Sequence, residues 1–377
     1  MEQEEPLIYN LPQDTLHQIF SSLPLRQIII CRSLSKFFNN LLTSPTFLHH
    51  ISTTLPPLNL LALRHHHYNH HNNHHIHLFD PNLNNWLHFP LNFLPFSSPL
   101  PVASSHGLIY LWAQPNNNNT QAQAQTQTQT LNTKSLLACN PLTRKFRILP
   151  HLGSAWCRHG SVLVDSVNRV MVLTELAALY YDDNNNKSWQ KFSSNLPSKP
   201  RSPVLIEDSA FALCDVGSPW RSQWKLFSCR VGSTMSMIWS RLERQEWGDV
   251  FDILKRPRLV RGVGNRILMI GGLKSSFSLN SPCSTILILR LDLGTMEWDE
   301  AGRMPVEMFR CFQDAGKFKV FGAGDRVCFS AKRIGKLALW DRGAEMGDEW
   351  RWIDNVPGNG DGLYRGFVFE GRLDALP

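Results

Sequence analysis

Apolar residues near the start of the chain recur at a helical period. Four of them fall at i, i+3, i+4 and i+7, on one face of a helix: Leu16, Ile19, Phe20 and Leu23. A second helical run covers 34–42 and is followed by Pro45, which we expect to end it. Pro12 and Pro24 suit the first turn of a helix, where a missing N–H costs nothing. The pattern predicts a helical domain over residues 7–48.

After residue 60 the helical period disappears, and short apolar runs alternate with polar turns. A turn followed by an aromatic residue occurs six times: Asp80-Pro81 to Trp86, Asn140-Pro141 to Phe146, Asp182-Asp183 to Trp189, Leu242-Glu243 to Trp247, Asp292-Leu293 to Trp298, and Asp341-Arg342 to Trp352. The aromatics are 60, 43, 58, 51 and 54 residues apart. A period of this size predicts a propeller with six blades of about four strands each.

Closure of that ring requires the two ends of the repeat region to meet. Residues 76–90 supply only the outer half of a blade, and 364–370 form a strand without a blade of its own. We expect this C-terminal strand to complete the first blade, because closure removes exposed strand edges. The expected fold is therefore a small helical domain followed by a six-bladed all-β propeller over 76–377.

Two low-complexity segments interrupt this plan. Residues 64–77 hold many histidines among Asn and Tyr, and 114–130 alternate Gln, Thr and Ala after a run of Asn. Such segments cannot build a packed core. The first is interpreted as part of a linker over 49–75 and the second as a loop insert. The His tract lacks a framed Cys/His spacing, so we expect no metal site there.

Composition narrows the class of protein. The chain has 377 residues, 42% of them hydrophobic, and a net charge of +7. That mild basic excess suits an acidic partner but lacks the density of a nucleic-acid-binding tail. No cysteine pair has CxxC spacing, and no window is apolar enough to span a membrane. We expect an intracellular protein, in the nucleus, the cytoplasm or both, that binds neither nucleic acid nor membrane directly.

The N-terminal motif resembles the F-box. The residues that carry the resemblance read Leu11-Pro12-Gln13-Asp14-Thr15-Leu16-His17-Gln18-Ile19-Phe20-Ser21-Ser22-Leu23-Pro24-Leu25 and then Cys31-Arg32-Ser33-Leu34-Ser35-Lys36-Phe37-Phe38. Phe37-Phe38 stands where the family usually has tryptophan. The repeat region, including the closing 366–375, is similar to the kelch-type propellers that follow F-boxes in plant proteins.

The resemblance implies a substrate receptor of a cullin-type (SCF) ubiquitin ligase. Its F-box would bind a Skp-type adaptor, and through it the cullin and RING subunits, while the propeller would recruit a target protein for ubiquitination. By the family pattern, the adaptor contact would be carried by Leu11, Pro12, Leu16, Ile19, Leu23, Pro24, Leu25 and Ile28, with support from Cys31, Arg32 and Leu34. An internal helical core is the alternative role for these side chains. The alternative function is an interaction scaffold or transcriptional cofactor without ligase work.

Arginines recur where one blade connects to the next. Each connection holds a proline and then an arginine that enters the next strand. We expect these arginines, with a further one near them and a tryptophan, to surround the channel mouth: Arg158, Arg201, Arg258, Arg261, Arg310, Arg365 and Trp156. Guanidinium groups so placed would favour an acidic or phosphorylated target. The alternative is that each arginine pairs within its own blade and Trp156 covers a blade core.

Catalytic motifs are missing from the sequence. It contains no GxSxG, HExxH or P-loop pattern, and Gly262-Val263-Gly264 lacks the third glycine of a dinucleotide fingerprint. We expect a non-catalytic subunit without a cofactor, whose only chemistry is to position a target.

Overall fold

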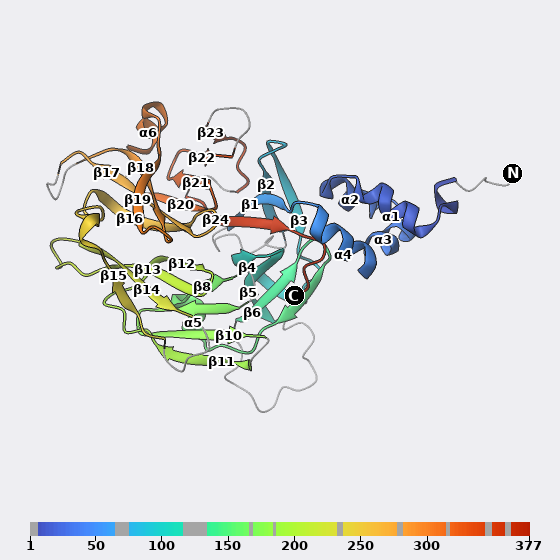
Figure 1. The fold of residues 1–377 in the computed structure, drawn as a ribbon, viewed down its shortest axis with the longest axis horizontal. Helices are drawn as coiled ribbons and strands as arrows, with labels where there is room; N and C mark the ends of the chain where they lie inside the picture. Colours follow the sequence, from blue (N-terminus) through green and yellow to red (C-terminus); the bar gives the residue numbers. More distant parts are fainter. Residues whose placement is uncertain are drawn as a thin grey trace.

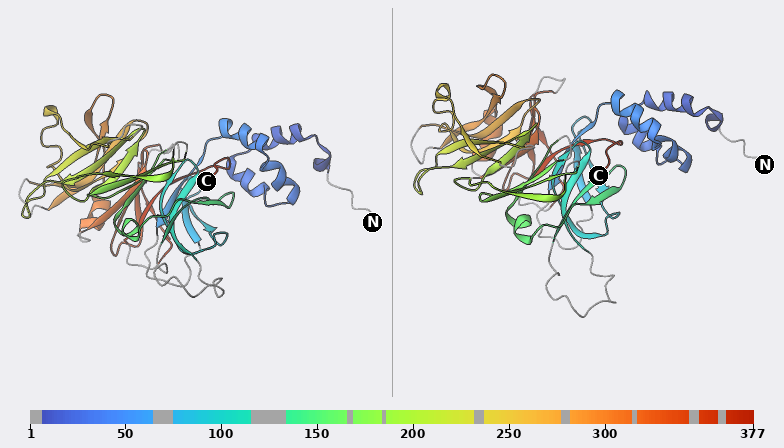
Figure 2. Two further views of the ribbon diagram at one scale, coloured as in Figure 1. Left: turned by 90° about the horizontal axis from the view of Figure 1, so that it is seen from below. Right: turned by 60° about the horizontal axis from the view of Figure 1, so that its bottom comes forward.

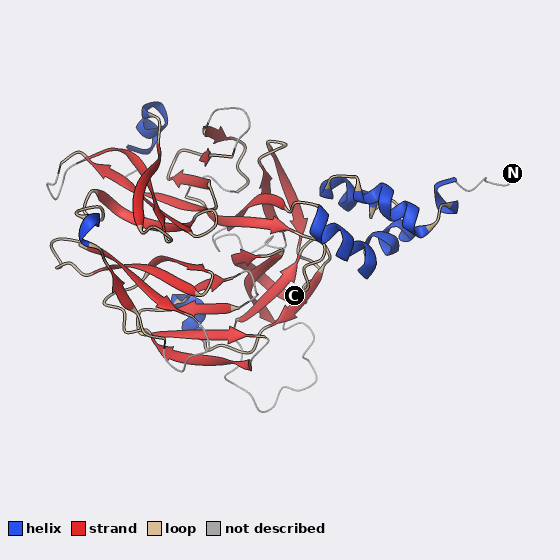
Figure 3. Cartoon of the chain, viewed as in Figure 1, coloured by secondary structure: helices blue, strands red, loops and turns tan. Residues whose placement is uncertain are grey.

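The computed structural model describes residues 7–64, 75–115, 134–165, 169–183, 186–231, 237–276, 282–313, 317–343, 349–358 and 363–377. Helices gather at the N-terminal end and strands make up most of the remainder (Figure 3). The His-rich tract and the Gln/Asn-rich insert lie outside the described residues except at their edges.

The helical unit consists of one 3-10 helix and four short α-helices: η1 (Leu7–Asn10), α1 (Gln13–Ser21), α2 (Leu25–Cys31), α3 (Lys36–Leu42) and α4 (Pro45–Thr54). Pro12 and Pro24 directly precede α1 and α2. The hydroxyls of Ser35 and Ser44 accept hydrogen bonds from the backbone N–H groups of Phe38 and Phe47, which caps α3 and α4.

The helical run over 34–42 ends at Leu42, before Pro45, as expected, but Pro45 then begins the further helix α4. Proline is tolerated at the first position of a helix because that N–H has no partner there. As a result the helical unit extends to Thr54, six residues beyond the predicted end at 48.

The rest of the chain forms six sheets of four antiparallel strands each, which are the blades of a propeller. From the inside outward, the first three blades are β24 (Arg365–Gly371), β1 (Leu58–Arg64), β2 (His75–Asp80) and β3 (Asn85–Pro90); β4 (Phe96–Ser105), β5 (Leu108–Pro115), β6 (Ser135–Asn140) and β7 (Lys145–Ile148); and β8 (Ser161–Val164), β9 (Val170–Leu173), β10 (Ala177–Asp182) and β11 (Asn186–Ser193). The last three are β12 (Arg201–Ile206), β13 (Ser209–Asp215), β14 (Trp224–Arg230) and β15 (Ser240–Leu242); β16 (Leu254–Arg261), β17 (Arg266–Lys274), β18 (Cys283–Asp292) and β19 (Glu297–Arg303); and β20 (Phe318–Ala323), β21 (Arg326–Ala331), β22 (Leu337–Asp341) and β23 (Trp350–Ile353).

The first blade is closed by the C-terminal strand, as the sequence predicts. β24 pairs with β1 along its whole length, from Leu58 opposite Gly371 to Arg64 opposite Arg365. A Cβ on Gly366 would lie only 2.0 Å from the carbonyl oxygen of Ala62, so this close approach requires glycine. The Ser104 hydroxyl donates a hydrogen bond to the carbonyl of Val368 and ties the closing strand to the second blade.

The expected linker over 49–75 is corrected at both of its described ends. Its first part belongs to α4, and Leu58–Arg64 form β1, the strand that receives β24. Leu60, Leu61, Ala62 and Leu63 are all buried, so β1 lacks the alternation of a half-exposed strand. A continuous apolar run of this kind can belong to a strand buried on both faces.

A separate apolar core lies between each pair of neighbouring blades, and a further core lies inside the helical unit. The aromatics of the predicted repeat mostly stand on the outer strand of their blade. Trp247 is an exception, because it lies in the 3-10 helix η3 (Gln245–Trp247) after β15 and its Nε1 donates to the carbonyl of Met296. The predicted turn at Leu242-Glu243 is therefore wrong, and β14 joins β15 through 231–239 instead.

The helical unit packs against the rim of the propeller next to the first two blades (Figure 1). Two further views show it projecting from the same side of the ring (Figure 2). Leu142 from the β6–β7 turn and Leu373 from the C-terminal tail enter the core of the helices. The guanidinium of Arg32 donates to the carbonyl of Leu142 at 3.0 Å, and Arg26 forms an ion pair with the buried Asp80. These contacts fix the helices on the ring.

Candidate functional site

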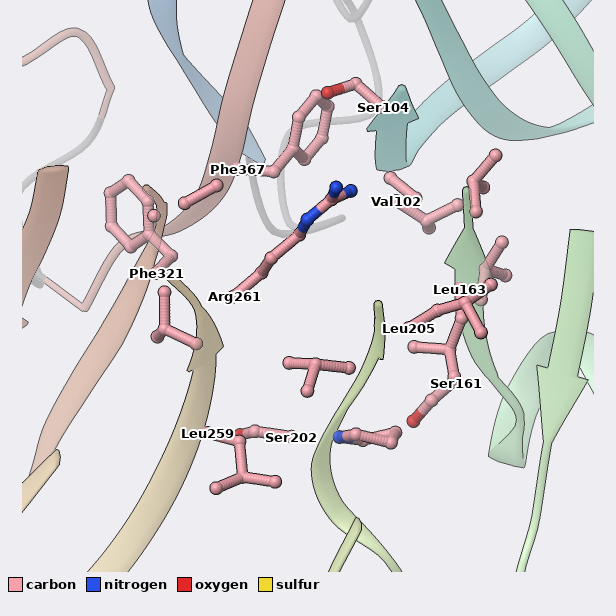
Figure 4. A pocket seen from close by; sticks show the side chains of 18 of the residues that line it. Val102, Ser104, Ser161, Leu163, Ser202, Leu205, Leu259, Arg261, Phe321 and Phe367 are labelled. Carbon is pink, nitrogen blue, oxygen red and sulfur yellow. The ribbon is translucent and has the colours of Figure 1, made fainter. Parts of the chain in front are cut away.

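The innermost strands of all six blades line a central cavity of about 1100 Å³. Each of these strands begins at the same end of the ring, where one blade connects to the next. Figure 4 shows side chains from several of them converging on the cavity, with Arg261 reaching in between Phe367 and Val102. A cavity of this volume can admit several residues of a peptide or a small polar ligand.

Positive charge dominates the lining of this cavity. A single carboxylate, Glu370, belongs to the described lining, against eight Lys and Arg side chains: Arg64, Arg158, Lys199, Arg201, Arg258, Arg261, Lys319 and Arg365. A cleft lined by one sign of charge concentrates ligands of the opposite sign and accelerates their association.

Three of these cations are destabilised by burial and by one another. Burial, with added repulsion from Arg365, Arg258 and Arg201, lowers the pKa of Lys319 to about 8. Burial, followed by repulsion from Arg201, lowers the pKa of Arg258 to about 10. The pKa of Arg201 is also lowered, first by burial and then by Arg256. An anion placed among them would offset the repulsion and favour their charged forms.

Aromatic rings hold two of the guanidinium groups in place. Arg201 lies 4.5 Å above the ring of Trp224, and Arg258 lies 5.7 Å from the ring of Phe318. Nη1 of Arg201 is buried and has no hydrogen-bond partner within the described part of the chain. A preorganised cation with an unused donor is suited to bind a carboxylate or a phosphate.

The structure brings together most of the predicted target-binding residues but not all of them. Arg158, Arg201, Arg258, Arg261 and Arg365 line the one cavity. Arg261 does not enter its strand as expected: it is the last residue of β16, whereas Arg201 and Arg365 are the first residues of theirs. Arg310 does not: it lies on the helix α6 (Val306–Gln313), its side chain is 71% exposed, and it pairs with Glu307 at 3.1 Å. Trp156, on α5 (Ser154–His159), packs partly buried against the core between the second and third blades.

Sequence reasoning missed three basic lining residues, Arg64, Lys199 and Lys319. Lys319 follows the first residue of β20, close to where Arg201 and Arg365 begin their own strands. The signal was present, since a cation near the start of an innermost strand is a repeated position. The repeat of arginines alone does not include Lys319, because β20 carries a lysine at this position.

The helical unit offers a second candidate surface, and it is apolar. Of thirteen exposed large apolar side chains among the described residues, five lie within residues 11–37: Leu11, Ile19, Ile30, Leu34 and Phe37. Exposed apolar residues concentrated on a small domain mark a partner surface. Ile30 and Phe37 were not among the predicted contact residues.

The predicted adaptor-binding residues divide into exposed and internal groups. Leu11, Pro12, Ile19, Pro24 and Leu34 are exposed. Leu16, Leu25 and Ile28 are buried in the core of the helices, and Leu23 and Cys31 pack partly buried against it. Arg32 faces the propeller, where burial and then Arg144 lower its pKa. The internal group positions the exposed one rather than offering free surface.

None of the helices in the described ranges is long and apolar enough to cross a membrane.

Comparison with known proteins identifies both parts of the chain. Residues 8–50 match the model of the F-box domain, and 257–305 match that of the kelch motif, a stretch that includes most of β16 and all of β17–β19. SKP1-interacting partner 15 of Arabidopsis thaliana is 63% identical over 382 residues, covering 97% of this chain and 98% of its own. An F-box/kelch-repeat protein of Arabidopsis thaliana is 25% identical over 369 residues, covering 92% of this chain and 82% of its own. Among solved structures, a functionally unknown protein from Desulfotomaculum acetoxidans is 9% identical with a TM-score of 0.41, covering 81% of this chain and 98% of its own.

Proposed function

Because this chain belongs to the F-box/kelch-repeat family of plant proteins, we propose that it is the substrate-receptor subunit of a cullin-type (SCF) ubiquitin ligase. The F-box binds a Skp-type adaptor, which links it to the cullin and RING subunits, and the propeller holds the target protein. The observation that carries the proposal is the match of an F-box to helices that leave Leu11, Ile19 and Leu34 exposed. It acts inside the cell, in the nucleus, the cytoplasm or both.

The chain itself supplies no nucleophile in this proposal. Its contribution is to hold target lysines near a charged ubiquitin carrier, which raises their effective concentration. The fixed packing of the F-box against the first two blades supports this role, because it sets the direction in which the channel faces relative to the adaptor.

The target-binding surface in this proposal is the basic cavity. Arg158, Arg201, Arg258, Arg261 and Arg365 bind acidic or phosphorylated residues of the target, together with Lys319. The lowered pKa values of Arg201, Arg258 and Lys319 and the unused donor of Arg201 support this assignment. Arg310 and Trp156 are left out of the surface because they do not line the cavity.

The experiment that tests adaptor binding is co-expression with a plant Skp-type adaptor followed by gel filtration. We expect stoichiometric co-elution of the wild type, and loss of co-elution for the paired variant Leu11→Ala with Ile19→Ala. Both side chains are exposed, so the variant keeps its fold. Leu83→Ala with Leu176→Ala, which removes exposed apolar residues from the propeller, is the matched control and retains the complex. A folded wild type that elutes alone would leave a free-standing binding module in place of a ligase receptor.

A further inference from the structure

A second cavity, of about 520 Å³, lies beside the central one. Arg201, Arg258 and Lys319 line both cavities. These three cations therefore form a wall that a single bound ligand can touch from either side.

The second cavity is apolar in its depth. The side chains of Ile286, Phe309, Phe312 and Phe318 line it, and Ile286, Phe309 and Phe312 belong to the core between the fifth and sixth blades. α6 buries Phe309 and Phe312 along one face, and Phe312 stacks on Trp352 with ring centroids 6.1 Å apart. Rigid aromatic walls of this kind suit a large apolar side chain.

Three further cations line the second cavity besides those of the shared wall. Lys255, Arg256 and Lys317 line it, and no carboxylate belongs to its described lining. A bulge in the pairing of β16 with β17, between Lys255 and Arg258, lets successive basic residues reach the same cavity. An apolar hollow whose described lining holds cations and no carboxylate is complementary to an apolar side chain flanked by acids.

We propose that this side cavity binds a large apolar residue of the target, while an acidic or phosphorylated residue beside it binds Arg201, Arg258 and Lys319 in the shared wall. The inference rests on the proposed function, because it names the target segment that the receptor reads. The recognised segment is a short peptide that carries both kinds of residue close together, because the apolar side chains and the three cations line the same cavity.

The test uses the full chain co-expressed with its adaptor and a randomised twelve-residue peptide library displayed on yeast. Enriched peptides are resynthesised with fluorescein, in glutamate and phosphoserine versions, and their affinities measured by polarisation. We expect enriched peptides to combine an acid with Leu, Ile, Met, Phe or Trp. Exchange of that apolar residue for Ala should weaken binding about tenfold, which corresponds to loss of one well-buried anchor.

Cys283→Phe fills the side cavity without changing charge, and Cys311→Phe, on the exposed side of α6, is its matched control. The first variant should weaken the parent peptide about tenfold and the Ala peptide less than about twofold. If Cys283→Phe melts well below the wild type, Cys283→Leu is used in its place. Arg258→Gln with Lys319→Gln should weaken both peptides, whereas Lys332→Gln, exposed elsewhere on the sixth blade, should weaken neither.

Three outcomes would overturn the inference, and they are distinguishable from failure of the proposed function. If the enriched peptides are acidic but show no apolar preference, the side cavity is not a target site and only the basic channel remains as one. The same conclusion follows if neither cavity-filling variant changes the affinity. If apolar residues are enriched without acids, the three cations of the shared wall are excluded as a contact for the target. A library without enrichment removes both cavities as target sites, while co-elution with the adaptor still stands. Tighter binding of the phosphoserine version would assign the anion as phosphate, and equal binding would assign it as carboxylate.

Discussion

The F-box exposes Leu11, Ile19 and Leu34, whereas the mouth of the propeller channel presents Arg201, Arg258 and Lys319. Binding at the first surface is favoured because apolar side chains leave water, and this contribution depends little on salt or pH. The second depends on an opposite charge and is weakened by salt. The difference suits a receptor that stays on its adaptor while targets associate and leave.

The largest expected effect separates the two surfaces directly. Ile19→Asp places a charge in the proposed adaptor contact and should weaken adaptor binding at least about 30-fold, since central anchors contribute on the order of 2–4 kcal/mol and about 1.4 kcal/mol is tenfold. Binding of an acidic peptide to the channel should stay within about twofold. Isothermal titration of both ligands checks this. A parallel loss of peptide binding would show that the two surfaces are not independent.

Salt should distinguish the surfaces without any substitution. Raising sodium chloride from 50 to 300 mM should weaken the acidic peptide about tenfold, because the cations of the channel are screened. Adaptor affinity should change less than about twofold. Equal salt dependence of the two affinities, measured by fluorescence polarisation, would contradict an electrostatic channel.

Alkaline pH should weaken only the channel. Lys319, with its pKa lowered to about 8, is mostly charged at pH 7 and mostly neutral at pH 9. Binding of a glutamate peptide should therefore fall about threefold over that range, by loss of one cation from the cluster. Lys319→Gln should bind more weakly at pH 7 and show little further change. A wild-type affinity that stays flat to pH 9 would exclude Lys319 from the contact.

The smallest expected effect is on stability. The folded-state pKa of Lys319 lies below its unfolded value, so the folded chain binds fewer protons above pH 8, and stability rises with pH from about 8 to about 10. Lys319→Gln removes the repulsion and should raise Tm at pH 7 by about 1–2 °C. The gain should vanish at pH 10. A lower Tm at pH 7 would mean that Lys319 supports the fold instead of carrying a binding charge.

The sequence predicts the blades well because each one repeats a turn and an aromatic, such as Asn140 before Phe146. It fails where a side chain departs from the repeat. β1 was missed because Leu60–Leu63 are buried on both faces, and Trp247 was misplaced because it fills a core from a connection. Pro45 follows the end of α3 as expected, but it also begins α4, because the missing N–H costs nothing at the first helical position.

The sequence predicts that the candidate site is basic, but it does not predict which residues line it. The repeated position of Arg201 and Arg365 indicates a ring, yet Arg310 falls on a helix whose presence no repeat reveals. The side cavity exists only because α6 brings Phe309 and Phe312 against β18 and β20, and no local pattern encodes that contact. In the F-box, the motif does not tell which apolar residues are internal, because Leu373, from the far end of the chain, completes their core.

The position of Leu373 has a consequence for synthesis. The helices of the F-box are made before the propeller, but one side chain of their core, Leu373, is made only after the closing strand β24. The same tail supplies the Arg372 and Ala375 carbonyls that accept hydrogen bonds from the amide of Asn140. A prematurely terminated chain therefore has an open ring together with an unfinished docking unit. Synthesis through Leu373 and Ala375 is therefore needed before either the ring or the core of the F-box is complete.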